Sequence, residues 1–250
     1  MAAFKDARPR FRKGGPEVLP RLDRLLQGWQ KLDPGHTRPP LPLLALALIA
    51  THGLELAGPS FPLALLTMFF AYLRPGEALS RREADLVAPS GVPAITTAGI
   101  PAPAGCFTLH LHPASRGERS KTGATDESVM LDAADAPWLG PLLQQLLAGV
   151  PHRHLFGLSY PQAKSFWDSA VQRAGLAAIK PVMYMCRHGG PSHDRRMRLR
   201  SQEEVKRRLR LVSDSALRRY EAHALIQLEE NKLGESLLAE ARTAWRLLPE

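Results

Sequence analysis

The sequence predicts a mainly helical domain that carries one small antiparallel β-sheet, an α+β arrangement. Residues 43–56 are apolar on nearly every side, as expected of a helix in the centre of a domain. Residues 107–112 alternate apolar and polar side chains, the pattern of a half-buried strand. The chain has 250 residues, of which 44% are hydrophobic, enough for one large domain or two small ones.

The N-terminal part, residues 1–42, is basic and rich in Pro and Gly, and we expect it to be a tether with one short helix at 16–32. The predicted domain spans 43–250. After the central helix, Ser60 is a candidate N-cap for a second apolar helix that ends at Leu73, before Pro75. A short helix and turn should follow at 75–86.

The central part of the domain should contain the strands. A brief strand is expected at 92–96, and 107–112 and 128–131 should pair through an extended hairpin, because the polar segment between them contains two glycines. Helices should then cover the remainder of the chain. Their expected ranges are 137–147, 161–174, 182–193, 201–209, 213–221 and 224–247.

The charge of the chain favours a polyanionic partner. The formal net charge is +9 and the isoelectric point is about 10.0, which suits nucleic acid first and an acidic membrane surface second. The two cysteines, Cys106 and Cys186, form no disulfide framework, which favours a reducing compartment. The start of the chain lacks the apolar core of a signal peptide, and the apolar runs are too short to span a bilayer.

Four residues could together perform phosphoryl transfer. Arg74 opens an Arg-Pro-Gly-Glu turn, and Arg187 opens an Arg-His-Gly-Gly segment. Lys121 lies in the predicted hairpin, and Tyr220 follows Arg218 and Arg219. Two guanidinium groups can hold both non-bridging oxygens of a phosphodiester. A lysine can protonate a leaving alkoxide, and a tyrosine hydroxyl can attack phosphorus.

Each residue alone also has a purely structural interpretation. An arginine after an apolar helix is usually a solvated helix end, a hairpin lysine is usually solvated, and a late tyrosine usually packs in a core. A P-loop around Lys121 is excluded because Ser120 and Ser115 occupy the positions where that motif needs glycine. A metal site at Cys106, His110 and His112 lacks the partner motifs that metal sites normally show.

Taken in order, the four segments resemble the catalytic domain of the tyrosine recombinases, also called phage-type integrases, over residues 41–248. The resemblance implies that fold, and it implies site-specific DNA cleavage and rejoining through a 3′-phosphotyrosyl intermediate on Tyr220. Arg74 and Arg187 would bind the scissile phosphate, Glu77 would orient Arg74, and Lys121 would protonate the leaving 5′ oxygen. No cofactor and no metal would be needed.

Two positions depart from the pattern of that family. Tyr184 occupies the place of the histidine in the usual His-x-x-Arg motif, and Leu211 stands nine residues before Tyr220, where His or Trp is usual. His188 is then a candidate for the supporting role that this histidine has in the family. These departures leave open an impaired protein of mobile-element origin that only binds DNA, and a basic helical scaffold that does not touch DNA is a third alternative. The family usually has an N-terminal clamp domain, for which 1–42 is too short.

The partners follow from charge and from the resemblance. Residues 187–220 contain 11 Lys and Arg against 4 Asp and Glu, which predicts a surface for double-stranded DNA. The C-terminal helix has an apolar stripe that either packs on its own core or, as the resemblance implies, docks on a second copy. We expect an intracellular protein, located with its DNA and not with a membrane. The candidate DNA-contacting residues are Arg195, Arg196, Arg198, Arg200, Lys206 and Arg207.

Overall fold

The computed structural model divides the chain into two units, Met1–Arg38 and Pro39–Glu250. It describes residues 24–25, 28–29, 32, 38–89, 106–120, 123–149, 154–211, 217, 220 and 223–249. The predicted strand at 92–96 and Lys121 therefore lie outside the described residues. So does most of the predicted helix at 213–221.

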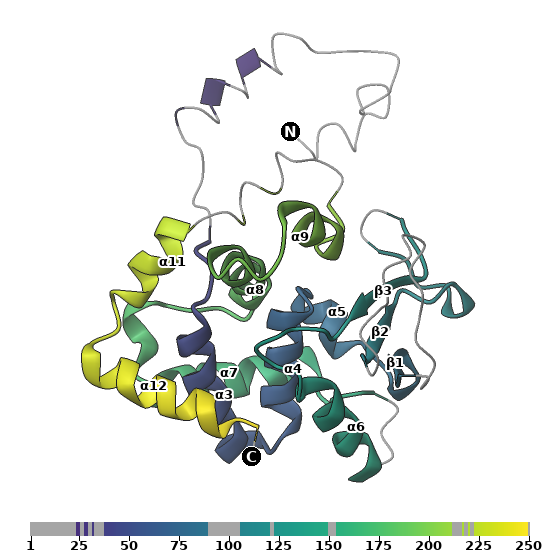
Figure 1. The fold of residues 1–250 in the computed structure, drawn as a ribbon, viewed down its shortest axis with the longest axis horizontal. Coiled ribbons are helices and arrows are strands. Elements are labelled where there is room, and N and C mark those ends of the chain that lie inside the picture. The colour runs from purple at the N-terminus through teal and green to yellow at the C-terminus, as the bar shows by residue number, and fades with distance from the viewer. Residues whose placement is uncertain are drawn as a thin grey trace. The chain divides into compact units, whose positions relative to one another are not determined.

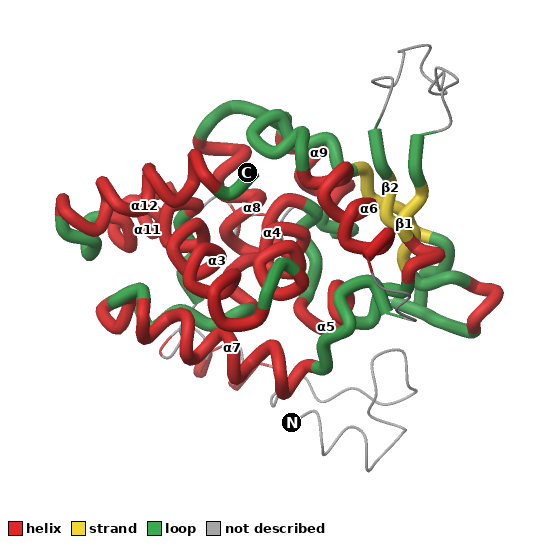
Figure 2. Tube along the Cα trace, turned by 90° about the horizontal axis from the view of Figure 1, so that it is seen from below, coloured by secondary structure: helices red, strands yellow, loops and turns green. Residues whose placement is uncertain are grey.

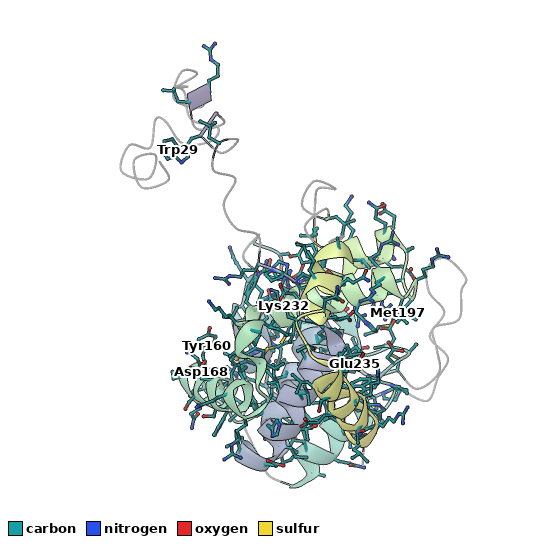
Figure 3. All side chains as sticks on the ribbon, turned by 90° about the vertical axis from the view of Figure 1, so that its left-hand side faces the viewer. Trp29, Tyr160, Asp168, Met197, Lys232 and Glu235 are labelled. Carbon is teal, nitrogen blue, oxygen red and sulfur yellow. The ribbon has the colours of Figure 1, made fainter. Side chains whose placement is uncertain are left out.

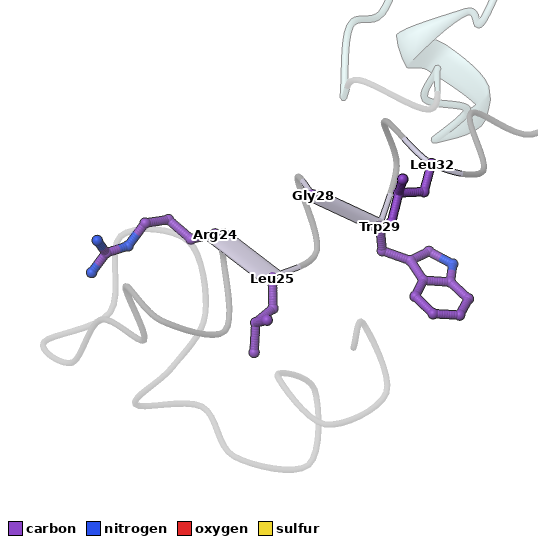
Figure 4. A pocket seen from close by; sticks show the side chains of 5 residues that line it. All are labelled: Arg24, Leu25, Gly28, Trp29 and Leu32. Atoms are coloured by element: carbon purple, nitrogen blue, oxygen red, sulfur yellow. The ribbon is translucent and has the colours of Figure 1, made fainter.

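In the first unit, the described residues 24, 25, 28, 29 and 32 are helical, and they lie within the range where a short helix is expected. Arg24, Leu25, Gly28, Trp29 and Leu32 line an open hollow of about 530 Å³ (Figure 4). Leu25, Trp29 and Leu32 recur at helical spacing and are all more than 65% exposed. This apolar face is thus not covered by the described residues of its own unit.

The second unit is built around two buried helices, α3 (Leu43–Ala57) and α4 (Ser60–Phe70) (Figure 1). Both are largely buried, as the all-round apolar pattern predicted. Ser60 is not the N-cap of α4. Pro59 takes that position because its ring holds φ at −71°, already suited to a helix, and α4 therefore begins at Ser60 without a side-chain cap.

A three-stranded antiparallel sheet lies at one side of this helical core, next to α5 (Pro75–Leu79) and α6 (Leu139–Gly149) (Figures 1 and 2). The strand order is β1-β2-β3, where β2 (Thr108–Leu111) pairs with both neighbours. Leu109 of β2 faces Val129 of β3, and both side chains are buried against the core. The predicted hairpin is thereby confirmed. The outer strands are β1 (Leu86–Val87) and β3 (Glu127–Met130).

Helix α8 (Tyr184–Arg196) crosses close to α4 because two of its residues have no side chain. A Cβ atom at Gly190 would lie 1.9 Å from the backbone oxygen of Phe69, and one at Gly189 would lie 2.3 Å from that of Leu41. Neither position therefore has room for a side chain, and α8 packs closely at both glycines. It brings the Arg187 segment against the turn that follows α4.

The remaining helices before residue 211 agree with the predicted ranges to within a few residues. Helix α7 (Tyr160–Arg173) begins after a serine N-cap, and α9 (Gln202–Arg208) ends two residues before Arg210. Three 3-10 turns complete this part, Glu83–Asp85, Ala114–Arg116 and Leu176–Ala178.

The predicted single helix at 224–247 is wrong, because the chain forms two helices there, α11 (His223–Glu230) and α12 (Glu235–Leu247). Gly234 has extended backbone angles at the start of α12, and the buried Leu233 fixes the break against the core. Asn and Gly in this segment are also weak helix formers.

The apolar stripe of α12 packs on the core of its own unit. Ala241 and Ala244 are buried, and α12 lies along α3. The ring of Trp245 lies 6.0 Å from that of Phe70 and 5.9 Å from that of Trp138. Of the two alternatives for this stripe, packing within the chain is the one observed. Among the described residues, no helix is long and apolar enough to cross a membrane.

Candidate functional site

Arg74 is placed by a tight turn between α4 and α5. Tyr72 has a left-handed backbone with φ of 55°, and Pro75 occupies the first position of α5, where its missing N–H is harmless. Glu77, in the first turn of α5, accepts a hydrogen bond from the backbone N–H of Arg74 at 2.9 Å and also pairs with its guanidinium. Glu77 thus contacts both the backbone and the side chain of Arg74.

Arg187 reaches the same carboxylate from α8. Its Nη1 donates to the backbone oxygen of Tyr72 at 2.6 Å and lies 3.3 Å from Glu77 Oε2, and its Nη2 donates to the backbone oxygen of Leu209 at 3.0 Å. The side chain is only 1% exposed. Arg187 therefore joins the turn after α4 to the end of α9, and it is far more buried than Arg74, which is 33% exposed.

A third guanidinium, which the sequence did not single out, completes this cluster. Arg210 Nη2 donates to Glu77 Oε2 at 2.7 Å, and its Nε lies 3.7 Å from Glu127 Oε2 on β3. In the sequence, Arg210 is only one member of a basic run. Its position just after α9, next to Leu211, was the signal that could have drawn attention to it.

The charges of the cluster stabilise one another. Burial alone would raise the pKa of Glu77, but Arg210, the backbone N–H of Arg74 and Arg187 outweigh it and the pKa is lowered. Burial acts to lower the pKa of Arg74, yet Glu77 and a hydrogen bond with Tyr184 leave that pKa raised. Glu77 is thus a carboxylate and Arg74 is a cation throughout the neutral range.

Tyr220 is linked to this cluster through a column of rings. Its ring stacks on His188 with centroids 4.9 Å apart and planes 16° apart, and His188 lies 5.3 Å from the ring of Tyr184. Tyr184 in turn hydrogen-bonds with Arg74. Ser192 of α8 donates to the backbone oxygen of Tyr220 at 2.8 Å, which fixes that residue against α8. The structure therefore brings Arg74, Arg187 and Tyr220 into one neighbourhood.

The two departures from the family pattern differ in kind. Tyr184 replaces an imidazole by another polar ring that touches Arg74. Leu211 is half-buried and packs against the cluster of Tyr72, Val205 and Tyr220, so it contributes apolar contact and no hydrogen bond from its side chain. His188 presents a ring face to Tyr220, and an imidazole takes up a proton at a ring nitrogen, in the plane of the ring.

The hairpin that carries Lys121 is anchored at its base by ion pairs. Arg116 donates to both carboxylate oxygens of Asp85, at 2.7 and 2.8 Å, and the buried Arg81 donates to Glu118 at 3.0 Å. Burial would raise the pKa of Asp85, but the bonds from Arg116 and from the backbone N–H of Arg82 lower it. Two buried or half-buried arginines thus hold the hairpin to the segment after α5.

One of the predicted DNA-contacting arginines, Arg200, forms ion pairs within the fold. Arg200 pairs with Asp132 at 2.7 Å and with Asp194 at 2.9 Å, and its side chain is only 13% exposed. Arg208 joins the same Asp132 at 2.8 Å and lies over the ring of Tyr72. These pairs tie α8 and α9 to the end of β3, so Arg200 has a structural task here.

The other predicted residues remain nearer to solvent. Arg198 and Arg207 are exposed, and Arg198 follows the exposed Met197 at the end of α8 (Figure 3). Arg196 is exposed but pairs with Glu230 at 2.6 Å, and Arg195 donates to the backbone oxygen of Arg200 at 3.2 Å. Lys206 is half-buried. Within the described part of the chain, no cluster of three or more His, Cys, Asp or Glu could hold a metal ion.

The fold resembles that of a known DNA recombinase. No protein-family model matches the sequence, and no curated protein matches it. Among solved structures, the XerH site-specific recombinase bound to difH substrate in a pre-cleavage complex is similar, with a TM-score of 0.52 and 19% identity over 84% of this chain. A post-cleavage complex of XerH with palindromic difH has a TM-score of 0.49 and 20% identity over 79% of this chain.

The similarity to the pre-cleavage complex establishes the fold and no more. The chain covers 55% of the XerH chain in that complex and 53% in the other, about half of its length. A mainly helical unit with a three-stranded antiparallel sheet, resembling a tyrosine recombinase catalytic domain, is thus confirmed.

Proposed function

We propose that this chain cleaves and rejoins DNA strands through a covalent phosphotyrosyl intermediate, as a tyrosine recombinase does. The observation that carries the proposal is the arrangement of Arg74, Arg187 and Tyr220. Two guanidinium groups from separate elements meet on Glu77, and a column of rings connects them to a tyrosine. The fold shared with XerH, a recombinase whose structures are DNA complexes, supports the same conclusion.

The chemistry is a transfer of one phosphoryl group between two oxygens. The Tyr220 hydroxyl gives its proton to water, to an oxygen of the phosphate or to His188, and its oxygen forms a bond to the scissile phosphorus. The bond from phosphorus to the 5′ oxygen breaks, and Lys121 gives that 5′ oxygen a proton. The guanidinium groups of Arg74 and Arg187 neutralise charge on the non-bridging oxygens. Removing one such preorganised donor typically costs about 2.7 to 4 kcal/mol in the transition state.

A second candidate function is DNA binding without cleavage. It is favoured by the apolar Leu211, by the 1% exposure of Arg187, and by the 7% exposure of Tyr220. In this arrangement a phosphate reaches Arg187 only after neighbouring side chains have moved. The same electropositive surface would then hold DNA without reacting with it.

Covalent trapping separates the two functions. In a duplex with a nick just beyond the scissile phosphate, cleavage releases the short fragment that carries the new 5′ hydroxyl, so the protein–DNA link cannot reverse. We expect a covalent adduct with the unmodified chain and none with Tyr220→Phe, while the two proteins bind an intact duplex equally. An adduct that persists in Tyr220→Phe would refute the assignment of the nucleophile. Binding without any adduct in either protein would support the second candidate.

Self-association on DNA is a further part of this proposal. Because the stripe of α12 is occupied by its own core, we place the apolar surface for a second copy on α11, where Leu225 and Leu228 are 36% and 55% exposed. Light scattering of the protein on a duplex should show an assembly that Leu228→Ser weakens. An unchanged assembly would place the contact elsewhere. We also propose that the protein works inside the cell, where its DNA is.

A further inference from the structure

Arg210 has no part in the mechanism described so far, although it belongs to the same cluster. Its Nη2 lies 2.7 Å from Glu77 Oε2, closer than the 3.3 Å of Arg187 Nη1 to the same oxygen. Glu77 therefore serves three guanidinium groups, those of Arg74, Arg187 and Arg210. One carboxylate cannot neutralise three cations.

The cluster has an excess of positive charge. A further carboxylate, Glu127, approaches Arg210 Nε with its Oε2 at 3.7 Å. Three arginines and two glutamates leave one uncompensated positive charge in a largely buried place. Burial lowers the pKa of Arg210, and Arg187 and Arg74 lower it further, against the opposite effects of Glu77 and Glu127. A bound anion would relieve this repulsion.

Two hydrogen-bond donors in the cluster are also unused. Arg210 Nη1 and Arg187 Nε are both buried, and neither has a hydrogen-bond partner among the described residues. Buried donors are normally satisfied, so an unsatisfied pair in one site is a feature to be explained. The oxygens of a phosphodiester are acceptors only, and they match such donors in charge and in geometry.

Glycine suits the backbone conformation of Arg210. Arg210 has φ of 58°, in the left-handed region, just after the C-terminal end of α9. Glycine is the usual residue at such a position because it has no Cβ to clash, so a glycine there removes the guanidinium without straining the backbone.

We propose that Arg210 binds the scissile phosphate as a third guanidinium and replaces the donor that Leu211 cannot supply. Leu211 is the next residue in the chain and stands where the recombinase resemblance implies a His or Trp. The ligand is a phosphodiester of DNA. The inference rests on the proposed function for its cleavage step, but anion binding by Arg210 does not depend on cleavage.

The first test measures anion binding by the full chain. Inorganic phosphate is added at constant ionic strength, set with chloride, and the melting temperature is followed. Phosphate should stabilise the unmodified protein, and Arg210→Gly should lose at least tenfold in apparent affinity. The matched control is Lys180→Gly, which likewise removes a cation from a left-handed residue, with φ of 49°, but at an exposed place outside the site. Equal phosphate affinities in Arg210→Gly and Lys180→Gly would overturn the proposal.

The second test uses the nicked duplex at saturating protein. Arg210→Gly should slow adduct formation at least a hundredfold, Arg210→Lys should be intermediate, and Lys180→Gly should match the unmodified protein. Adding Leu211→His to Arg210→Gly should restore adduct formation to at least a tenth of the rate of the unmodified protein. A purely structural role of Arg210 would not predict this recovery. Adduct formation by Arg210→Gly within threefold of the unmodified rate would overturn the proposal. If no protein forms an adduct, the cleavage function fails, and the phosphate test alone decides the role of Arg210.

Discussion

Replacing Glu77 by Gln tests whether this carboxylate is the counter-ion of the whole site. Glu77 accepts from the backbone N–H of Arg74, from the guanidinium of Arg74, from Arg187 Nη1 and from Arg210 Nη2. Glutamine has nearly the same shape, but one of its two terminal groups is a donor. That NH₂ group would face guanidinium donors, and the negative charge would be lost.

The size of the effect follows from these interactions. Breaking a buried ion pair by removing one partner costs about 3 to 5 kcal/mol. We take the lower end, about 3 kcal/mol, because Arg74 is 33% exposed and water screens part of the charge. For a chain of this size each kcal/mol lowers the melting temperature by about 2 to 4 °C, so a loss of about 6 to 12 °C is expected.

Thermal melting of Glu77→Gln and a matched control variant measures this loss of stability. Glu55→Gln removes a carboxylate that is 61% exposed and lies 3.7 Å from Arg173, and it should change the melting temperature by less than about 2 °C, since exposed pairs contribute about 0 to 1 kcal/mol. Saturating phosphate should recover part of the loss in Glu77→Gln and nothing in Glu55→Gln. Equal melting temperatures for the two variants would refute the idea that Glu77 holds the cluster together.

Three other predictions follow from the packing and the charges. Gly190→Ala should lower the free energy of unfolding by about 3 kcal/mol, because its Cβ would overlap the backbone of Phe69. Gly76→Ala has open space around it and should raise the free energy of unfolding by about 0.5 to 1 kcal/mol. Urea denaturation compares the two variants, and equal stabilities would contradict the packing argument. Replacing Arg198 and Arg207, which are exposed, by Ala should weaken the salt dependence of DNA binding. The slope of log affinity against log salt concentration should become shallower by up to about 0.9 for each phosphate that is no longer neutralised. An unchanged slope would place the DNA surface elsewhere. Burial would raise the pKa of Asp132, but Arg208 and Arg200 outweigh it and the pKa is lowered. The stability that the ionised Asp132 contributes is therefore present above about pH 4 and is lost as the pH falls through the lowered pKa. Melting curves at acid pH should show that Asp132→Asn makes the melting temperature depend less on pH.

The helical framework could be predicted because its signals are local. The apolar runs of α3 and α4, the alternation in β2 and the proline after Leu73 each report on a few neighbouring residues. The break between α11 and α12 was missed, although Gly234 lies at it. Its cause is tertiary, since Leu233 is drawn into the core, and the pattern of the sequence alone does not reveal which residues the core accepts.

The site was only partly predictable for the same reason. Arg74, Glu77, Arg187 and Tyr220 stand in recognisable local strings, and the structure brings them together. Arg200 and Arg210 looked alike in the sequence, as members of one basic run. What separates them is the position of distant carboxylates: Asp132 is 68 residues from Arg200, and Glu77 is 133 residues from Arg210.

The column formed by Tyr184, His188 and Tyr220 restricts how Tyr220, the proposed nucleophile, would lose its proton. Stacking on His188 engages the face of the Tyr220 ring, whereas the phenolic oxygen of Tyr220 lies at the edge of that ring. Tyr184 is engaged with Arg74, and a phenol is a poor proton acceptor at neutral pH. The proton of Tyr220 must therefore pass to water, to an oxygen of the phosphate, or to His188 after its ring has turned. A site with three guanidinium groups suits the first two routes, because concentrated positive charge stabilises the phenolate as it forms. Arg210 would then contribute to activation of the nucleophile as well as to binding of the phosphate.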